Sequence, residues 1–404
     1  MKRVALISLL LLLSLPLAAQ TGFVRAQGKH LVDAKGNKLI LRGTNLGNWM
    51  VPEGYMWHFE DGPQSPREIK EFVTQMLGPQ QAKAFWHEWR NNYVTQQDIE
   101  FLKSIGFNVI RVPIHYQFFT TDNAEGFALL DRVVDWSSKA GIYVIIDMHA
   151  APGGQTGTNI DDSWNYPWLF EDAEAQQQTI DIWTRIAKHY RNNKTVVGYD
   201  LLNEPVPPFP NLAKYNDKVE PLMRRITEAV RKVDPNHVMI ITGSNWDSNF
   251  KVLGPPFDKN AMYTFHKYWT EPTQKVIQDY IDYSNKYNVP LLMGESGENK
   301  DEWITKFTQV LEKNEINWTY WPYKKMDAPT SICSFPRPLH WEAVTKFAQI
   351  PQHTGNAEKL IATRPSLEDS RAAFNDLLQK IQFKNCKLNP GYIKALGMNL
   401  PAVN

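Results

Sequence analysis

Two glutamates have the residue type and the surroundings of a catalytic pair. Glu204 follows a short apolar run, and Glu295 follows another such run, about three strand-and-helix units further along the chain. One carboxyl group can protonate a departing oxygen while the other, as a carboxylate, attacks the carbon that this oxygen leaves. Two such groups facing each other at about 5 to 5.5 Å would cleave a glycosidic bond by double displacement, with retention of configuration.

Five more polar or aromatic residues stand at the ends of other predicted strands: Arg111, His149, His266, Tyr268 and Trp321. The carboxyl ends of parallel strands in a closed barrel gather at one rim, and active sites form there. A single polar residue at a strand end commonly caps a helix or satisfies a loop. Six strands that deliver such groups, the two glutamates included, indicate one shared site.

The two glutamates must differ in protonation for this chemistry. Arg111, if it reaches Glu295, would hold that carboxylate ionised by charge pairing. A second anion nearby disfavours the charged form of Glu204, so that its pKa rises. We therefore predict that Glu204 is the acid/base and that Glu295 is the nucleophile.

The elements that must position these residues alternate along the chain. Eight short apolar runs are typical of strands: 40–46, 108–112, 143–147, 197–202, 237–242, 262–265, 290–293 and 317–321. Amphipathic stretches at three-to-four spacing lie between several of them. Apolar strands that alternate with helices indicate a parallel sheet that is buried on both faces. Eight such units predict an α/β fold, a (β/α)8 TIM barrel, and no strand is followed by the glycine-rich loop of a dinucleotide-binding sheet.

The ends of the chain predict three further features. Residues 1–19 combine two basic residues, an apolar core and a final Ala18-Ala19, which is the pattern of a secretory signal peptide. The turn at residues 35–37 predicts a short N-terminal β-hairpin, and residues 367–382 predict an extra C-terminal helix. We therefore expect residues 20–404 to form a single glycoside hydrolase catalytic domain that is secreted or periplasmic.

The composition limits the classes of partner that the protein can bind. A formal net charge of +1 without a long basic run argues against a nucleic-acid partner. No segment after residue 19 approaches about 18 consecutive apolar residues, so we expect no membrane insertion. Fourteen tryptophans are consistent with an oligo- or polysaccharide substrate, because indoles stack on sugar rings. We expect a monomer, and the spacing of Cys333 and Cys386 leaves a disulfide and two free thiols equally open.

Two other functions compete with the glutamate pair. In a metal-dependent hydrolase, His149, His266 and Glu295 would bind zinc together with a water molecule. The first strand carries no His-x-His pair and the histidines are isolated, which argues against that site. Two carboxyl groups and water suffice for glycoside hydrolysis, so we expect neither a metal nor another cofactor. A non-catalytic carbohydrate-binding barrel would need the aromatic residues but not two opposed acids.

The order of these residues resembles glycoside hydrolase family 5, the large cellulase family of clan A. The resemblance covers about residues 39–325, and its motifs are Arg111, Asp147-Met148-His149, Asn203-Glu204-Pro205, His266-Lys267-Tyr268, Gly294-Glu295-Ser296 and Trp321. It implies the same acid/base role for Glu204 and the same nucleophilic role for Glu295. It also implies that Asn203 hydrogen-bonds the 2-hydroxyl of the sugar.

The same resemblance implies roles for the remaining residues of the rim. Tyr268 and Arg111 would orient the nucleophile. His149 and His266 would contact the substrate or the groups next to it. Trp321 would form the platform beneath the sugar at the cleavage point.

Two stretches resemble the branch of this family that contains exo-β-1,3-glucanases. They are Gly-Thr-Asn-Leu-Gly-Asn-Trp at residues 43–49, which leads to Glu53, and His-Ala-Ala-Pro-Gly-Gly-Gln at residues 149–155. In that branch the acid that matches Glu53 binds hydroxyls of the terminal glucose. Gly54-Tyr55 stand here where the branch usually has Pro-Trp. We expect cleavage of a β-glucan, with a β-mannan or xyloglucan hydrolase of the same fold as the alternative, and endo or exo action stays open.

Overall fold

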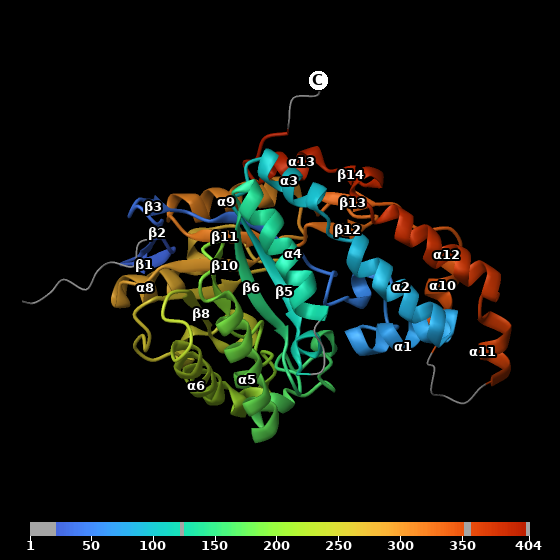
Figure 1. Cartoon of the computed structure of the whole chain (residues 1–404), viewed down its shortest axis with the longest axis horizontal. Coiled ribbons are helices and arrows are strands. Elements are labelled where there is room, and N and C mark those ends of the chain that lie inside the picture. The colour runs from blue at the N-terminus through green and yellow to red at the C-terminus, as the bar shows by residue number, and fades with distance from the viewer. Residues whose placement is uncertain (1–21, 122–124, 351–356, 401–404) are drawn as a thin grey trace, which may run out of the picture.

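The computed structural model describes residues 22–121, 125–350 and 357–400. The predicted signal peptide lies outside the described residues. A closed barrel of eight parallel strands forms the centre (Figure 1). Its strands are β4 (Arg42–Asn45), β5 (Val109–His115), β6 (Tyr143–Ala150), β7 (Val196–Asp200), β8 (Val238–Thr242), β9 (Ala261–His266), β10 (Leu291–Glu295) and β11 (Asn317–Tyr320). Each overlaps one of the eight predicted runs, which confirms the predicted barrel.

Helices cover the outside of the barrel because each presents an apolar stripe to the strands. They are α3 (Gln96–Ser104), α4 (Glu125–Ala140), α5 (Ala173–Tyr190), α6 (Val219–Arg231), α8 (Gln278–Tyr287) and α9 (Asp301–Lys313), and α13 (Pro390–Ala395) packs on α9. The short α7 (Ser244–Asp247) lies instead after β8, beside the barrel mouth. In α5 the buried residues Ile182, Trp183 and Ile186 repeat at that spacing. Within the described ranges, no helix is long and apolar enough to cross a lipid bilayer.

The barrel interior has an apolar layer below and a polar layer above. Successive side chains of a strand point to opposite faces, so residues two apart share the inner face. In β5 this places Val109 in the lower layer and Arg111 above it, and in β6 it places Ile145 below Asp147. The upper layer lies toward the carboxyl ends of the strands, so the polar groups gather at the rim.

A small antiparallel sheet covers the lower end of the barrel. It consists of β1 (Arg25–Gln27), β2 (His30–Val32) and β3 (Lys38–Leu39), and β2 and β3 form the predicted hairpin. Val24 and Leu31 belong to the same buried cluster as the apolar inner layer of the barrel. Among the described residues, the apolar layer and this sheet therefore lie below the polar layer, and the pocket lies at the upper rim.

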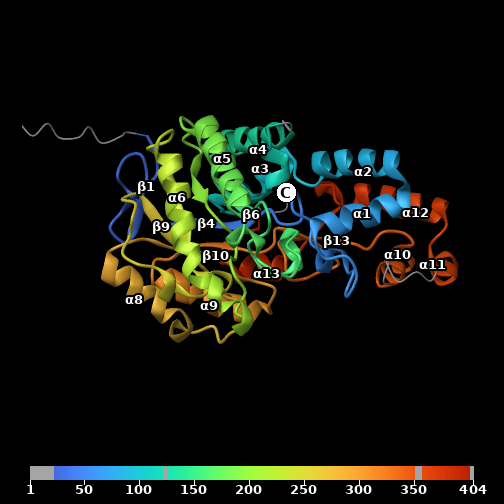
Figure 2. The ribbon, with the colours of Figure 1, turned by 90° about the horizontal axis from the view of Figure 1, so that it is seen from below.

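Five helices form a lobe beside the barrel, as Figures 1 and 2 show from two directions. They are α1 (Pro66–Leu77), α2 (Pro79–Asn92), α10 (Trp341–Ala348), α11 (Ala357–Thr363) and α12 (Leu367–Lys380). The prediction of one extra C-terminal helix is confirmed by α12 but was incomplete, because the other four were not expected. The helix α1 nevertheless has a clear start, since Ser65 and Glu68 form a capping box around Pro66.

Aromatic side chains join the lobe to the barrel. Trp57 of the short 3-10 helix η1 (Gly54–Trp57) stacks on Trp89, with ring centroids 4.7 Å apart. Its indole Nε1 donates to Asn48 Oδ1 at 2.8 Å, and its carbonyl accepts from Trp341 Nε1 at 2.9 Å. These residues belong to one buried cluster that continues into the barrel. The lobe therefore supports the segment that follows β4.

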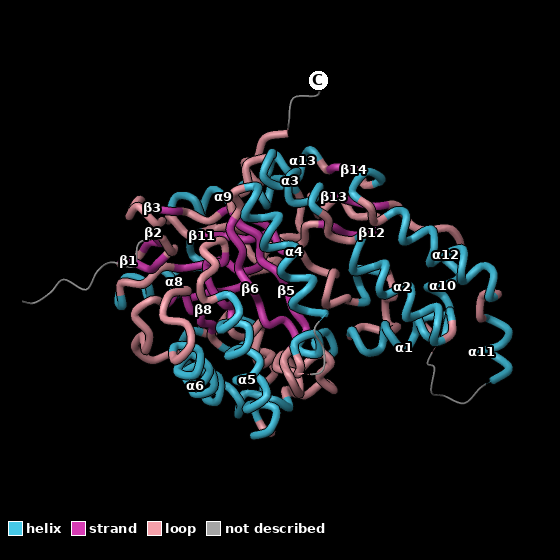
Figure 3. Tube along the Cα trace, in the orientation of Figure 1, coloured by secondary structure: helices cyan, strands magenta, loops and turns pink. Residues whose placement is uncertain are grey.

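A third sheet connects the last barrel strand to the C-terminal part of the chain. It contains β12 (Lys324–Met326), β13 (Cys333–Phe335) and β14 (Lys387–Leu388), and Figure 3 shows these strands between the barrel and the helices of the lobe. Cys333 is buried and Cys386 is half-buried, and both are free thiols. Of the two open alternatives for this pair, the structure has the free thiols.

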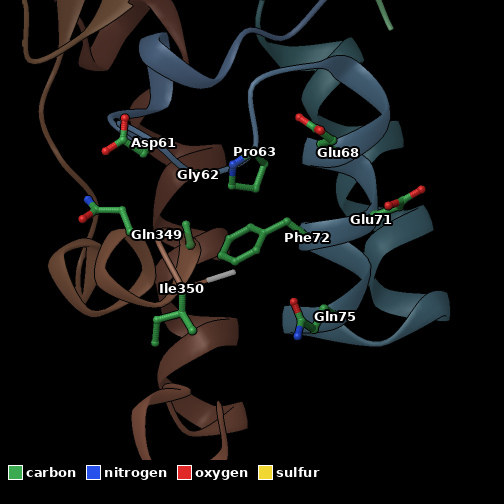
Figure 4. Close-up of a pocket in the computed structure, with 10 residues that line it drawn as sticks. Asp61, Gly62, Pro63, Glu68, Glu71, Phe72, Gln75, Gln349 and Ile350 are labelled. Atoms are coloured by element: carbon green, nitrogen blue, oxygen red, sulfur yellow. The ribbon is translucent and has the colours of Figure 1, made fainter. Parts of the chain in front are cut away.

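The lobe also has a hollow of its own between α1 and α10, with a volume of about 430 Å³. Figure 4 shows Phe72 at its centre, between Pro63 and Ile350. Asp61 and Glu71 are among the polar residues that line it, and none of the described lining side chains is basic. It lies outside the barrel mouth.

The shared aromatic core predicts that lobe and barrel unfold together. Trp57→Ala should lower the free energy of unfolding by about 3 to 5 kcal/mol, because it removes a fully buried indole and leaves a cavity. Trp269→Ala is the matched control, since that indole is 73% exposed, and should change stability by less than about 0.5 kcal/mol. Urea unfolding followed by far-UV circular dichroism measures both. Equal losses for the two variants, or two separate transitions, would contradict a shared core.

Candidate active site

A pocket of about 720 Å³ opens at the carboxyl ends of the barrel strands. Seven of the nine predicted site residues line it: Glu53, His149, Glu204, His266, Tyr268, Glu295 and Trp321. The other two, Arg111 and Asn203, are buried and hydrogen-bond each other. The structure therefore brings all nine predicted residues to one place.

Arg111 connects the groups beneath the pocket. Its Nη1 donates to Glu295 Oε1 at 2.6 Å, its Nε donates to Asp200 Oδ2 at 2.9 Å, and its Nη2 lies 3.0 Å from Asp147 Oδ1. Burial works to lower the pKa of Arg111, but the charges of these three acids outweigh it and raise the pKa. The prediction placed Arg111 after its strand. It lies instead within β5, where strand alternation points it into the barrel.

Asp147 and Asp200 were missed as site residues by the sequence analysis. Both are charged residues inside apolar strands, and that contrast was the available signal. Burial raises the pKa of Asp200, and the nearby Arg111 opposes that rise. Asn45 was also missed. Its Oδ1 accepts from Arg111 at 2.9 Å while its Nδ2 donates to the carbonyl of Gly294 at 3.1 Å.

Glu295 is held at both carboxylate oxygens. Oε1 accepts from Arg111, and Oε2 accepts from the Tyr268 hydroxyl at 3.1 Å. The register of β10 with β9 shifts between Met293 and Glu295, which turns this side chain toward the pocket. Gly294 permits the shift, because a Cβ there would lie 2.5 Å from Thr264 Oγ1. The nucleophile of the sequence prediction therefore has a fixed orientation next to a permanent cation.

Glu204 has a different environment. Burial raises its pKa to about 7, against the opposing charges of His149 and Arg111. Its backbone lies in the left-handed region, with φ 47°, a conformation that is rare for non-glycine residues and that occurs at functional sites. Its Oε1 lies 3.0 Å from Nδ1 of His266. At neutral pH this carboxyl group therefore exists in both protonation states.

His266 contacts Glu204 as a neutral imidazole. Burial lowers the pKa of His266 to about 3, although the charge of Glu295 works in the other direction. Asp247, which the sequence analysis missed, lies with its Oδ2 3.0 Å from His266 Nε2. Burial raises the pKa of Asp247 well above its usual range, and the charges of Asp200 and Glu204 raise it further.

The carboxyl groups of Glu204 and Glu295 face each other. One oxygen of each and a ring nitrogen of His266 all lie within 4.8 Å of one another. This closeness fits the about 5 to 5.5 Å between the carboxyl groups of retaining glycosidases and is shorter than the about 6.5 to 9.5 Å of inverting ones. The arrangement can therefore attack a carbon directly from one side and protonate its leaving group from the other.

His149 and Trp321 form a flat wall beside Glu295. Their rings are parallel within 2°, with centroids 5.3 Å apart. A Cβ at Gly47 would lie 2.4 Å from the Trp321 ring, so only glycine fits there. His149 Nδ1 lies 2.8 Å from Asp147 Oδ2. Burial works to lower the pKa of His149, but this aspartate and the other nearby acids raise it well above its usual range.

Glu53 lines the pocket next to His149. Its Oε1 is 3.6 Å from Nε2 of His149. Burial raises the pKa of Glu53 to about 7, against the effect of the adjacent His149. The backbone N–H of Glu53 donates to Asn48 Oδ1 at 3.3 Å, and the same oxygen accepts from Trp57. The lobe thus fixes this part of the pocket.

A buried amide holds the turn that carries Glu204. Gln155 Nε2 donates to the backbone carbonyls of Asn203 at 2.9 Å and His149 at 2.8 Å, and its Oε1 accepts from the backbone N–H of Ala151 at 2.9 Å. The backbone carbonyl of Gln155 accepts from the backbone N–H of Val206 at 2.9 Å. Val206 also has a left-handed backbone, with φ 58°. Gln155 therefore ties β6 to the strained turn after β7.

The geometry does not favour the metal alternative. Two sets of potential ligand atoms lie within 4.8 Å of one another, and their members are Asp147, His149 and Glu295, or Glu204, His266 and Glu295. In the part of the chain that is described, neither set combines the two histidines of the predicted zinc site. Each set includes Glu295, and a divalent cation there would be repelled by the guanidinium of Arg111.

Comparison with protein families gives one assignment. The sequence matches the family described as Cellulase (glycosyl hydrolase family 5) over residues 68–327. The matched span includes both glutamates of the pair and every barrel strand except β4.

Three curated relatives are named for different glycosidase activities. The chain is 33% identical over 255 residues to a β-xylosidase of Phanerodontia chrysosporium, covering 61% of this chain and 52% of that protein. It is 25% identical over 315 residues to endoglucanase C of Acetivibrio thermocellus, covering 61% and 89%. It is 30% identical over 243 residues to a sporulation-specific glucan 1,3-β-glucosidase of Saccharomyces cerevisiae, covering 54% and 53%. The chain spans about half the length of the first and third of these.

Solved structures share the fold at low identity. One described as endogalactoceramidase matches with a TM-score of 0.60 and 18% identity, covering 93% of this chain and 84% of that one. At this identity the likeness concerns the fold and not the reaction.

The contacts of Arg111 predict a large effect of its removal. Arg111→Met should lower the free energy of unfolding by about 3 to 5 kcal/mol, because buried acids lose their cation. Arg337→Met is the matched control, since that arginine and its partner Asp327 are half exposed, and it should cost less than about 1 kcal/mol. Urea unfolding at pH 7 compares them. A small loss for Arg111→Met would mean that the acids are protonated in the native protein.

Proposed function

The chain belongs to glycosyl hydrolase family 5, the cellulase family, and from this membership we propose that it hydrolyses β-glucosidic bonds of a β-glucan with retention of configuration. The family resemblance drawn from the sequence is confirmed. The observation that carries the proposed mechanism is the placement of Glu204 and Glu295 within 4.8 Å in unlike environments. Neither acid could fill the role of the other, because only Glu295 is paired with Arg111.

In the first step, Glu295 attacks the anomeric carbon and forms a covalent glycosyl ester. Glu204 gives its proton to the leaving oxygen, and the bond between that oxygen and the anomeric carbon breaks. In the second step, Glu204, now a carboxylate, takes a proton from water, and the water oxygen displaces Glu295. Two inversions leave a β-configured product. Each residue ends in the protonation state in which it began.

Asn203 has an atom that suits the substrate. Its Oδ1 accepts from Arg111 Nη2 at 2.9 Å, while its buried Nδ2 has no partner among the described residues. A buried donor without an acceptor is costly, so a ligand oxygen would gain from binding there. We assign this donor to the 2-hydroxyl of the sugar, where a hydrogen bond strengthens as positive charge develops on the ring.

Several features support a neutral β-glucoside as the substrate. Trp321 offers a flat ring in the pocket, and Glu53 offers a carboxyl group to sugar hydroxyls in the same pocket. The name of the glucan 1,3-β-glucosidase relative is consistent with this choice. The name of the β-xylosidase relative favours a β-xyloside as the second candidate.

The organisation of the chain is part of the proposal. We propose that residues 20–404 act as one catalytic domain, because the lobe and the barrel share a buried aromatic core. The sequence of residues 1–19 supports export to the periplasm or beyond. Nothing in the mechanism requires a second subunit, and we propose a monomer.

Product analysis tests the reaction and the substrate together. The mature protein is incubated with laminarin, cellulose-type, xyloglucan, mannan and xylan oligosaccharides, and the products are followed by proton NMR from the first minutes. We expect β-configured products from a β-glucan and none from Glu295→Ala, which lacks the nucleophile. Early α-configured products would contradict retention. Activity on none of these substrates would instead favour the non-catalytic barrel.

The raised pKa of Glu204 predicts a pH dependence. An acid must carry its proton, so kcat/KM on natural oligosaccharides should fall as the pH rises above about 7. Glu204→Gln should lose most of this activity but still cleave an aryl glycoside with a good leaving group, with added azide restoring turnover as a β-glycosyl azide. On the aryl glycoside, kcat/KM of Glu204→Gln should not fall as the pH rises above about 7, because the variant has no carboxyl group at this position to lose a proton. Steady-state rates from pH 4 to 9 measure this, and failure of azide to help would argue against the acid/base role.

A further inference from the structure

Glu298 is a carboxylate in the pocket that the proposed mechanism does not use. It lines the same cavity as Glu53, Tyr55 and Trp321, on the Trp321 side. The cavity contains Glu204 and Glu295 as well, but those two have roles in bond cleavage. Glu298 is close enough for its charge to contribute to the raised pKa of Glu53, after burial and the charge of Glu295.

The backbone is bent to present this residue. Glu298 has φ 49°, in the left-handed region, where a side chain other than glycine is strained. The preceding Gly297 pairs with Trp321 across the end of the barrel, and a Cβ there would lie 2.2 Å from the Trp321 carbonyl oxygen. A strained conformation persists only where the surroundings fix it, and such residues cluster at ligand sites.

Lys325 and Tyr55 fix the side chain in place. Lys325 Nζ forms an ion pair with Glu298 Oε1, and both side chains are largely buried. The same ammonium lies 4.4 Å from the centre of the Tyr55 ring. The Tyr55 hydroxyl accepts from Trp321 Nε1 at 2.7 Å. Glu298, Lys325, Tyr55 and Trp321 therefore form one connected wall, which we call the glycone wall.

The glycone wall depends on Gly54. A Cβ at this position would lie 1.9 Å from the carbonyl oxygen of Pro63, so only glycine allows η1 to pack there. Gly54-Tyr55 are the two residues that depart from the Pro-Trp of the related branch. The departure replaces an indole by a phenol that holds Trp321 through a hydrogen bond and Lys325 through its ring.

We propose that Glu298 is a second substrate-binding carboxylate, which together with Glu53 accepts hydrogen bonds from hydroxyls of the sugar that lies against Trp321. The inference rests on the proposed function, and it names the part of the substrate that this site selects. Two carboxylates on one side of a pyranose can accept hydrogen bonds from two neighbouring hydroxyls. The site therefore selects a sugar whose hydroxyls on that side carry no substituent. Tyr55 supports this as a positioning residue, because it holds Trp321 and the ammonium of Lys325.

The test compares Glu298→Gln with Glu302→Gln, a matched change of an exposed glutamate on α9. One readout is the Kd of the glucose-configured iminosugar 1-deoxynojirimycin by calorimetry. The other is kcat/KM on an aryl β-glucoside and on its 3-, 4- and 6-deoxy congeners. We expect Glu298→Gln to weaken both by about 10- to 100-fold, since it replaces a charged acceptor, and Glu302→Gln to change neither.

The congeners separate binding from a structural role. If Glu298 binds a hydroxyl, Glu298→Gln should lower kcat/KM only slightly on the congener that lacks this hydroxyl. On the other congeners it should lower kcat/KM as much as on the parent glucoside. An equal loss on every congener, or an unchanged Kd, would overturn the inference. Tyr55→Phe is the second variant, with an expected loss of about 2- to 10-fold, and circular dichroism checks that both variants fold. The two proposals can also fail separately. If the wild-type protein turns over no substrate but Glu298→Gln still weakens iminosugar binding, the proposed function is refuted and Glu298 remains a sugar-binding group.

Discussion

One buried guanidinium determines the arrangement of the site. Arg111 lies inside the barrel with carboxyl groups of Asp147, Asp200 and Glu295 around it. Removing such charges from water is costly, and only close pairing compensates for it. The barrel can therefore keep this polar layer only if four strands hold their side chains in register. The apolar layer below and the small sheet that covers it make the same interior inaccessible from the other end.

The different behaviour of the two glutamates follows from their distance to that cation. Glu295 accepts directly from Arg111, whereas Glu204 contacts a neutral imidazole and has a pKa of about 7 because it is buried. Asp247 lies on the far side of His266, and burial raises the pKa of its carboxyl group well above the usual range. Within 4.8 Å the structure thus holds one carboxyl group paired with a guanidinium and the other beside a neutral imidazole.

The helical lobe contributes to the pocket through a short segment. The 3-10 helix η1 presents Tyr55 to the pocket and buries Trp57 among the aromatic residues of the lobe. The backbone just before it carries Glu53. Two residues that line the pocket therefore come from a part of the chain that packs against the lobe.

The sequence by itself predicted the eight barrel strands, because their alternation with amphipathic stretches is a local pattern. Polar residues at strand ends, together with the family resemblance, gave the nine candidate site residues, whereas four helices of the lobe were not predicted. Alternation with period two marks strands, spacing of three to four marks helices, and polar residues at strand ends mark the rim. Only the tertiary structure decided which charges pair and how far each is buried. Asp200 and Asp247 are separated in sequence from the groups they contact, and Glu298 meets Lys325 across the end of the barrel. Such contacts, and the pKa shifts that come with burial, exist only once the barrel closes, since no residue encodes its distant neighbours alone.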